Sequence, residues 1–219
     1  MIQLIIMGFI IAASVIFSIK IPDIIMKYKN KTDIDDLSKA KKYTVTVLAC
    51  VALVASEIFI LTRGISLFNW VCFAIILTLS ATIIIVDTRC RIIPNLCLFP
   101  MLLTITVYLI YNTITKEMSV NIIYSIIGMI MMCFMMITVT NLLGFKGYLG
   151  AGDIKYFSVA AYLFTLTGQI VGMLTGLVAA IAIYMIPMLI AKKITMKSMI
   201  AFGPFIGFGV MFGICWMLA

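Results

Sequence analysis

Eight apolar runs dominate this sequence, and each is near the length that a helix needs to cross a bilayer. At about 1.5 Å per residue, about 20 apolar residues cover a hydrocarbon core of about 30 Å. Charged residues make up only 11% of the 219 residues, far fewer than in soluble domains. The sequence therefore predicts an all-α, polytopic integral membrane protein that forms one membrane domain over 1–219. The expected spans are 1–19, 43–62, 65–86, 95–112, 120–143, 154–167, 169–190 and 199–218, of which 154–167 is short.

The basic residues predict the orientation of these spans. Short loops on the cytoplasmic side of a membrane protein are enriched in Lys and Arg. If the first span runs from outside to inside, all of the 16 Lys and Arg residues except Arg63 and Lys116 fall on the inner side. Lys20 follows the first apolar run, whereas a secretory signal carries its charges before that run, so we expect a retained span. Both termini are then expected to be extracytoplasmic.

The longest polar stretch, at about 21–42, completes an N-terminal segment of one span and a short cytoplasmic loop. The sequence Thr-Asp-Ile-Asp at 32–35 is typical of a capping box with acids in the first helical turn. The lysines within 39–42 would then lie in the last turn, where cations favour the helix dipole. This pattern predicts a short cytoplasmic helix that leads into the second span.

Composition disfavours several classes of chemistry. The chain has no histidine, which removes a common general base and metal ligand. Its six cysteines show none of the paired spacings of metal sites, so we expect no metal and no cofactor. The net charge of +8 is not accompanied by a basic patch with aromatic or motif support, so nucleic-acid binding is not expected. The carboxylates become the main candidates.

The most informative short motif is Gly-Ala-Gly-Asp-Ile-Lys at 150–155, where a polar loop runs into an apolar span. An ionisable residue at a membrane boundary is costly unless it has a function, so Asp153 is a candidate site residue. Gly150 and Gly152 lack side chains and would let another helix or a substrate approach the carboxylate. The alternative is a loop that needs glycine, with Asp153 as the N-cap of the following span.

A second acid, Asp87, falls at the inner end of the third span, within Ile-Val-Asp-Thr-Arg-Cys-Arg-Ile-Ile-Pro-Asn at 85–95. Two carboxylates far apart in sequence are thus expected at the same membrane face and at similar depth. Like charges about 3 Å apart cannot both ionise, so such a pair shares a proton. One carboxylate then activates water while the other polarises a carbonyl group. This is peptide hydrolysis without histidine, cysteine, serine or metal.

Two other acids are expected to be structural. Glu57 lies in the outer half of the second span, and we expect it to pair with Arg63 or to snorkel to the outer interface. Glu117 lies beside Lys116 in an outer loop, where solvation is the expected state. Neither acid is expected to join Asp87.

Three segments together carry a resemblance to a known family. They are Asp87 followed by Ile-Pro-Asn at 93–95, the glycine-flanked Asp153 segment, and Ala-Phe-Gly-Pro-Phe-Ile-Gly-Phe-Gly at 201–209. In this order, the chain from about 65 to its end resembles the type IV prepilin peptidases, which are membrane aspartyl proteases of the Gly-x-Gly-Asp type. Presenilin-like and signal-peptide-peptidase-like enzymes share that string, but a Pro-Ala-Leu motif follows it, whereas this chain has Phe-Gly-Pro at 202–204.

The resemblance implies that Asp87 and Asp153 are the catalytic pair of a peptidase core over 65–219. The implied substrates are prepilins or pilin-like pseudopilins, whose basic leader ends in glycine before an apolar helix. Cleavage would occur at the cytoplasmic face of the cytoplasmic membrane of a bacterium or archaeon. Larger members carry two Cys-x-x-Cys pairs after the first span, whereas 21–42 contains no cysteine here. A protease without zinc or N-methylation activity is therefore expected.

Further residues are expected to shape this site. Pro94 forces Ile93 out of helical geometry and would end the segment that holds the first aspartate, or it simply opens the next helix. Lys155 is expected to hold the phosphate of a membrane lipid, or alternatively to tune the site. Gly203 and Pro204 would break the last span near its inner end, leaving backbone groups for a substrate or a close packing contact.

Two other functions stay open at this stage. A small transporter or channel subunit would use the two aspartates as a proton or cation site, although such sites usually lie near the membrane midplane. An inactive assembly factor of a pilus or secretion system would keep the fold without the reaction.

Overall fold

A computed structural model describes residues 2–28, 39–118, 121–142, 150–164, 169–190 and 201–219 of the chain. Within these residues the regular structure consists of eight α-helices. They are α1 (Ile2–Tyr28), α2 (Lys39–Leu61), α3 (Leu67–Cys90), α4 (Asn95–Thr115), α5 (Ile122–Leu142), α6 (Ala151–Phe164), α7 (Gln169–Ile190) and α8 (Gly203–Leu218). The all-α class predicted from the apolar runs is therefore confirmed.

The first two helices differ from the sequence expectation. α1 continues past the apolar run at 1–19 and includes Pro22 before it ends at Tyr28. α2 begins at Lys39, so the lysines within 39–42 open this helix instead of closing a separate one. No glycine or proline lies within α2 to separate these lysines from the apolar run. The expected cap at 32–35 lies outside the described residues.

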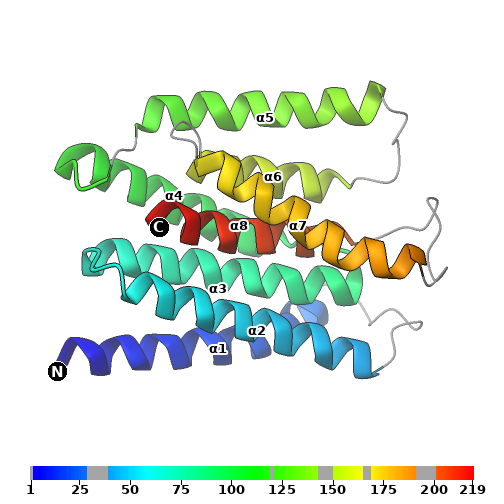
Figure 1. Cartoon of the computed structure of the whole chain (residues 1–219), viewed down its shortest axis with the longest axis horizontal. Coiled ribbons are helices and arrows are strands. Elements are labelled where there is room, and N and C mark those ends of the chain that lie inside the picture. Colours follow the sequence, from blue (N-terminus) through cyan, green and yellow to red (C-terminus); the bar gives the residue numbers. More distant parts are fainter. Residues whose placement is uncertain (1, 29–38, 119–120, 143–149, 165–168, 191–200) are drawn as a thin grey trace.

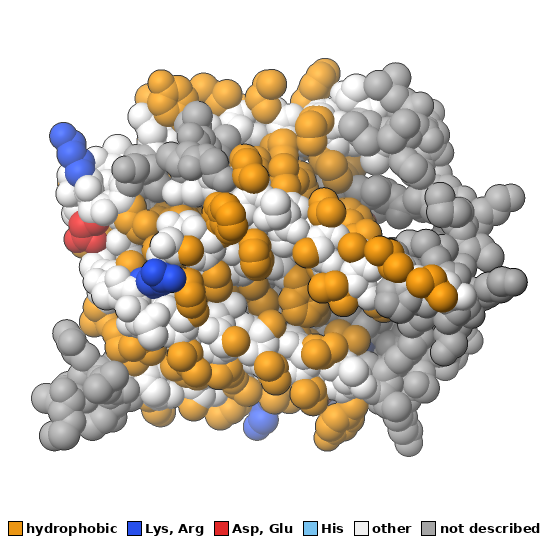
Figure 2. Space-filling model, viewed as in Figure 1, with side chains coloured by type: hydrophobic (Ala, Val, Ile, Leu, Met, Phe, Trp, Pro, Cys, Tyr) orange, Lys and Arg blue, Asp and Glu red, His pale blue; other side chains and the backbone are white. Residues whose placement is uncertain are grey.

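The helices suit a membrane-embedded protein. Four of them contain stretches long and apolar enough to cross a bilayer: Met7–Tyr28, Tyr43–Leu61, Leu67–Cys90 and Asn95–Thr115. Three shorter apolar stretches lie in α5, α7 and α8. Figure 2 shows a face on which apolar side chains are spread over several helices and few charged side chains appear. An exposed apolar surface of this extent is expected to face lipid or another protein, because it would be costly in water.

α3 is the central helix of the bundle. In α3, 83% of the apolar stretch is buried inside the bundle. The buried share is 28% for the apolar stretches of α1 and α2, and 39% for that of α4. α3 packs against α1, α2, α4 and α8, and Figure 1 shows it in the middle of the bundle. Close packing holds buried side chains in fixed positions. α3 is therefore a rigid support for Asp87 near its C-terminal end.

Glycines let α8 pack closely on two sides. On the side of α3, a Cβ atom on Gly203 would lie 2.7 Å from the Asp87 carboxylate. A Cβ atom on Gly207 would lie 2.5 Å from the Ile84 side chain. A Cβ atom on Gly209 would lie 2.9 Å from the carbonyl oxygen of Met173 in α7. Small residues at a helix interface allow the two backbones to approach. α8 is thus fitted between α3 and α7.

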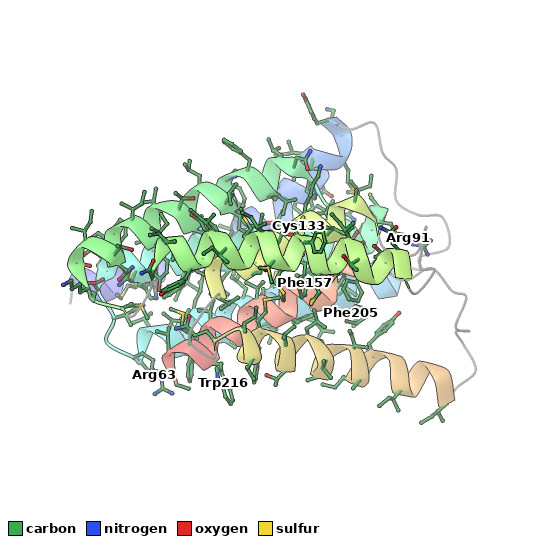
Figure 3. All side chains as sticks on the ribbon, turned by 90° about the horizontal axis from the view of Figure 1, so that it is seen from above. Arg63, Arg91, Cys133, Phe157, Phe205 and Trp216 are labelled. Atoms are coloured by element: carbon green, nitrogen blue, oxygen red, sulfur yellow. The ribbon has the colours of Figure 1, made fainter. Side chains whose placement is uncertain are left out.

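The two ends of the bundle hold different parts of the chain. α3 ends, and α6 and α8 begin, at one end, whereas both chain termini lie toward the other (Figure 1). Figure 3 shows the same separation, with Arg91 at one end and Arg63 at the other. Asp87, Asp153 and Gly203 therefore belong to one end, which we call the Asp87 end.

Candidate active site at the Asp87 end

Asp87 lies in the last turn of α3 and is nearly fully buried, with 4% of its surface exposed. The helix ends at Cys90, and the next residue, Arg91, adopts a left-handed conformation with φ of 51°. The Arg91 N–H donates to the Asp87 carbonyl oxygen at 2.8 Å. A left-handed cap of this kind satisfies carbonyl groups at a helix end. The cap fixes the backbone of Asp87 while its carboxyl group faces the interior.

The carboxylate of Asp87 is held by the backbone of α8. The Gly203 N–H donates to Asp87 Oδ2 at 2.9 Å. Hydrogen bonds to a charged acceptor are among the stronger ones in proteins. Any side chain at position 203 would place its Cβ 2.7 Å from the same oxygen. The contact therefore requires glycine at this position.

Gly203 and Pro204 stand at the start of the last helix, and residues 199–200 of the expected span lie outside the described part of the chain. α8 begins at Gly203, and Pro204 lies in its first turn. Proline suits that position because its missing N–H would have no partner within the helix, and its φ angle is already helical. The free N–H groups of this helix start are available to an acceptor, and Asp87 uses one of them.

Asp153 lies in the first turn of α6 and is partly buried. Its Oδ2 accepts a hydrogen bond from the Gly150 N–H at 2.9 Å, so the side chain reaches back to the residue that precedes the helix. This is the capping-box contact made from the third helical position, not the predicted N-cap contact. Asp153 precedes the apolar run at 154–167, and burial raises the pKa of its carboxyl group, while the Gly150 hydrogen bond opposes that shift.

The two aspartates lie within electrostatic reach of each other, since the charge of Asp153 acts on Asp87. No described pair of Cα atoms from α3 and α6 comes within 8 Å, whereas α8 packs against both helices. α8 is therefore the helix that links the two elements that carry the aspartates. The positive charge of Arg91 also favours the ionised form of the Asp87 carboxyl group.

The segment between α3 and α4 packs against the glycine motif of α6. A Cβ atom on Gly152 would lie 3.1 Å from Ile93 Cβ, so this glycine allows the close approach of Ile93. Pro94 is the N-cap of α4, with φ of −77° and ψ of 125°, and α3 has already ended at Cys90. Pro94 thus opens the next helix, as the alternative reading predicted, and it does not terminate the helix of Asp87.

Lys155 points away from the aspartate pair. It is exposed and lines an open groove of about 650 Å³ between α4, α5 and α6. Apolar side chains such as Phe99 and Phe134 form most of the lining, and Asn95 and Ser158 add polar groups. A cation beside an apolar groove suits the predicted contact with a lipid phosphate, which stays a prediction.

Glu57 does not pair with Arg63, so that expectation is wrong. Glu57 is fully buried in α2, and neither of its carboxyl oxygens has a hydrogen-bond partner of normal geometry among the described residues. Ser14 of α1 is its polar neighbour. The Arg63 guanidinium instead lies 4.5 Å from the centre of the Phe59 ring. Arg63 lies beyond the end of α2, whereas Glu57 is buried within that helix, so the two side chains point to different surroundings.

Glu117 is exposed at the opposite end of the bundle, but it is not simply solvated. It accepts hydrogen bonds from Asn69 Nδ2 at 3.1 Å and from the Tyr111 hydroxyl at 2.9 Å. These contacts tie the connection after α4 to the start of α3. Glu117 is therefore structural, and it does not join Asp87, as predicted.

Sequence reasoning identified both aspartates but missed how they are held. It treated Ile93 only as part of a motif, whereas this residue packs on Gly152. It also left the use of the Gly203 backbone open, because no pattern in sequence assigns a partner to a free N–H group.

Among the described residues, no group of three His, Cys, Asp or Glu side chains could hold a metal ion. No protein-family model, curated protein or solved structure matches the chain.

Proposed function

We propose that this chain is a membrane aspartyl endopeptidase that removes the basic leader from prepilin or pseudopilin precursors. The observation that carries the proposal is the convergence of three distant segments at the Asp87 end. Asp87 from α3 accepts a hydrogen bond from Gly203 of α8, and the charge of Asp153 from α6 acts on it. These segments are the ones that carry the resemblance to the type IV prepilin peptidases.

The proposed chemistry uses only the two carboxyl groups and water. One carboxylate takes a proton from a water molecule, and the oxygen of that water attacks the carbonyl carbon of the peptide bond. The other, protonated, carboxyl donates to the carbonyl oxygen, which gives a tetrahedral intermediate. As the C–N bond breaks, the protonated carboxyl group gives its proton to the leaving nitrogen, and the other carboxylate takes a proton from a hydroxyl group of the intermediate. The pair then returns to the state that shares one proton.

The proposed topology places the Asp87 end at the cytoplasmic face of the cytoplasmic membrane. All eight helices would span, and both termini would be extracytoplasmic. Arg89 and Arg91 lie at the Asp87 end, and cytoplasmic ends of spans are enriched in such residues. Residues 21–42 include no cysteine, which supports a protease that does not bind zinc or N-methylate its product. A membrane lipid at Lys155 is the second proposed partner.

The test is co-expression with a pilin-like precursor, followed by mass spectrometry of that precursor. Wild type is expected to remove the leader without adding methyl mass. Asp87→Asn and Asp153→Asn are each expected to lose cleavage by a factor of about 10³ or more, because neither can complete the shared-proton pair. Glu57→Gln is the control for loss of a buried carboxylate. Cleavage by either Asp variant, present in the membrane at wild-type level, would contradict the proposal.

A second candidate is a small transporter or channel subunit, and the burial of Glu57 favours it. An ionisable side chain buried inside a membrane bundle is a candidate ion or proton site. If Glu57→Gln abolished a measured ion flux and wild type cleaved no precursor, this candidate would replace the peptidase. An inactive assembly factor would show neither activity and would tolerate both Asp variants in a pilus or secretion assay.

A further inference from the structure

The groove between α4, α5 and α6 occupies only one half of the bundle. Its lining residues fall within 95–102 of α4, 129–137 of α5 and 155–159 of α6. α4 and α6 begin at the Asp87 end, whereas α5 runs toward that end (Figure 1). Cys133, which also lines the groove, lies nearer the middle of the bundle than Arg91 does (Figure 3). The groove therefore extends from the Asp87 end to about the middle of the bundle.

The length of the groove matches one leaflet of a bilayer. Its first and last lining residues on α4 are seven positions apart, which is about 10 Å at a rise of about 1.5 Å per residue. Half of a hydrocarbon core of about 30 Å is about 15 Å. A membrane-spanning helix of a partner would follow the bundle through the whole core, which this groove does not. The groove suits a ligand that occupies one leaflet, as a lipid does.

The walls of the groove are open to such a ligand. α5 packs closely on α6 but only weakly on α4, which is its neighbour in the sequence. Phe99 of α4 and Phe134 of α5 both line the groove, and they are 71% and 70% exposed. An alkyl chain between these walls would gain the dispersion contacts that the exposed rings lack.

The polar groups of the groove lie where a lipid headgroup would be. Lys155 and Asn95 are the lining residues nearest the starts of α6 and α4, and both are exposed. Ser158 lies deeper, and its hydroxyl already donates to the Ile154 carbonyl oxygen at 2.8 Å. None of the described lining residues is acidic. The mouth of the groove therefore attracts an anion and repels a basic leader peptide.

We propose that this groove binds one anionic phospholipid from the leaflet at the Asp87 end. Lys155 and the Asn95 amide group bind the phosphate, and one acyl chain lies between Phe99 and Phe134. Basic pockets between membrane helices are typical sites for anionic headgroups. The inference rests on the membrane setting of the proposed function and specifies the lipid partner named there. It does not depend on the peptidase reaction.

The headgroup is tested by native mass spectrometry of the full chain in detergent. Phosphatidylglycerol or phosphatidylcholine with identical acyl chains is added, and the retained lipid is counted. Wild type is expected to retain the anionic lipid about fivefold better, and Lys155→Gln is expected to lose that preference. The control is Lys27→Gln, because Lys27 is an exposed lysine in the last turn of α1 and lies outside the groove. Equal retention of both lipids by wild type, or the same preference in Lys155→Gln, would overturn the headgroup site.

The acyl chain is tested by filling the groove. Ile130 lines it and is 59% exposed, so Ile130→Trp adds bulk without disturbing the core. This variant is expected to retain several-fold less of either phospholipid. The control is Ile123→Trp on the same helix, at a position that is 64% exposed and outside the groove. Equal retention by the two variants would show that the chain does not lie in the groove.

Photo-crosslinking in vesicles separates a bound lipid from the lipid that surrounds any membrane protein. Phosphatidylglycerol with a diazirine on its acyl chain is reconstituted with the full chain, and adducts are located by peptide mass spectrometry. Adducts are expected to be enriched within 95–102 and 129–137 over the exposed apolar residues elsewhere. Even labelling of all exposed apolar faces would overturn the site. Because no precursor is present, enrichment would support the lipid site even if wild type cleaved no precursor, and even labelling would leave the peptidase proposal intact.

Discussion

Asp87 depends on a glycine that is 116 residues away in the sequence. The acid is fixed from three directions: by its own helix, by the left-handed cap at Arg91, and by the N–H of Gly203. Asp153 depends instead on its immediate neighbours, because its carboxylate is bound by Gly150. One member of the pair is thus held by the tertiary fold and the other by local structure.

This difference predicts the effect of adding one methyl group. In Gly203→Ala the new Cβ would lie 2.7 Å from Asp87 Oδ2, so the carboxylate must move or lose its hydrogen bond. A displacement of about 1 Å at a catalytic group costs about a hundredfold in rate, and we expect a loss of precursor cleavage of that order. The control is Gly8→Ala in α1, where the added Cβ would meet nothing within 4 Å. Wild-type cleavage by Gly203→Ala would contradict the role of this contact.

At the scale of helices, local sequence decides where elements begin and end. Pro94 and Pro204 each occur where a helix starts, as expected from their fixed φ angle and missing N–H. α3 ends without proline or glycine, through the left-handed Arg91, and no sequence signal indicated that cap. The Gly-Pro pair at 203–204 opens α8, a position that suits proline as well as an interruption of a span does.

The packing of α7 against α8 predicts a stability effect separate from catalysis. In Gly209→Ala the added Cβ would lie 2.9 Å from the Met173 carbonyl oxygen and 3.1 Å from Leu177 Cβ. The backbone cannot turn away as a flexible side chain can, so we expect overpacking to lower the free energy of unfolding by about 1–3 kcal/mol. Thermal unfolding in detergent, with Gly8→Ala as the reference, measures this. A midpoint equal to that of the reference would show that the interface adapts.

For the whole molecule, the grouping of charges and termini predicts an orientation. The proposed topology places the C-terminus outside the cytoplasm and the Asp87 end inside. A C-terminal alkaline phosphatase fusion should therefore be active in a bacterial host, whereas a green fluorescent protein fusion at the same position should not fluoresce. The reverse pattern would place the Asp87 end outside and would remove access to a cytoplasmic leader peptide.

The sequence by itself determined the all-α class and the approximate extent of most helices. A span in lipid must satisfy its own backbone hydrogen bonds, so length and apolarity are sufficient to predict it. The sequence also selected Asp87 and Asp153, because acids at the ends of apolar runs are rare and costly. These conclusions need no knowledge of how the helices pack.

Only the tertiary structure decided which faces of the helices meet. Spans that are apolar on every side have almost no amphipathic signal, so sequence cannot indicate a buried face. For that reason the pairing of Glu57 with Arg63 was wrong, and the contact of Gly203 with Asp87 was not foreseen. The contact of Gly203 with Asp87 depends on the close packing of α8 on α3.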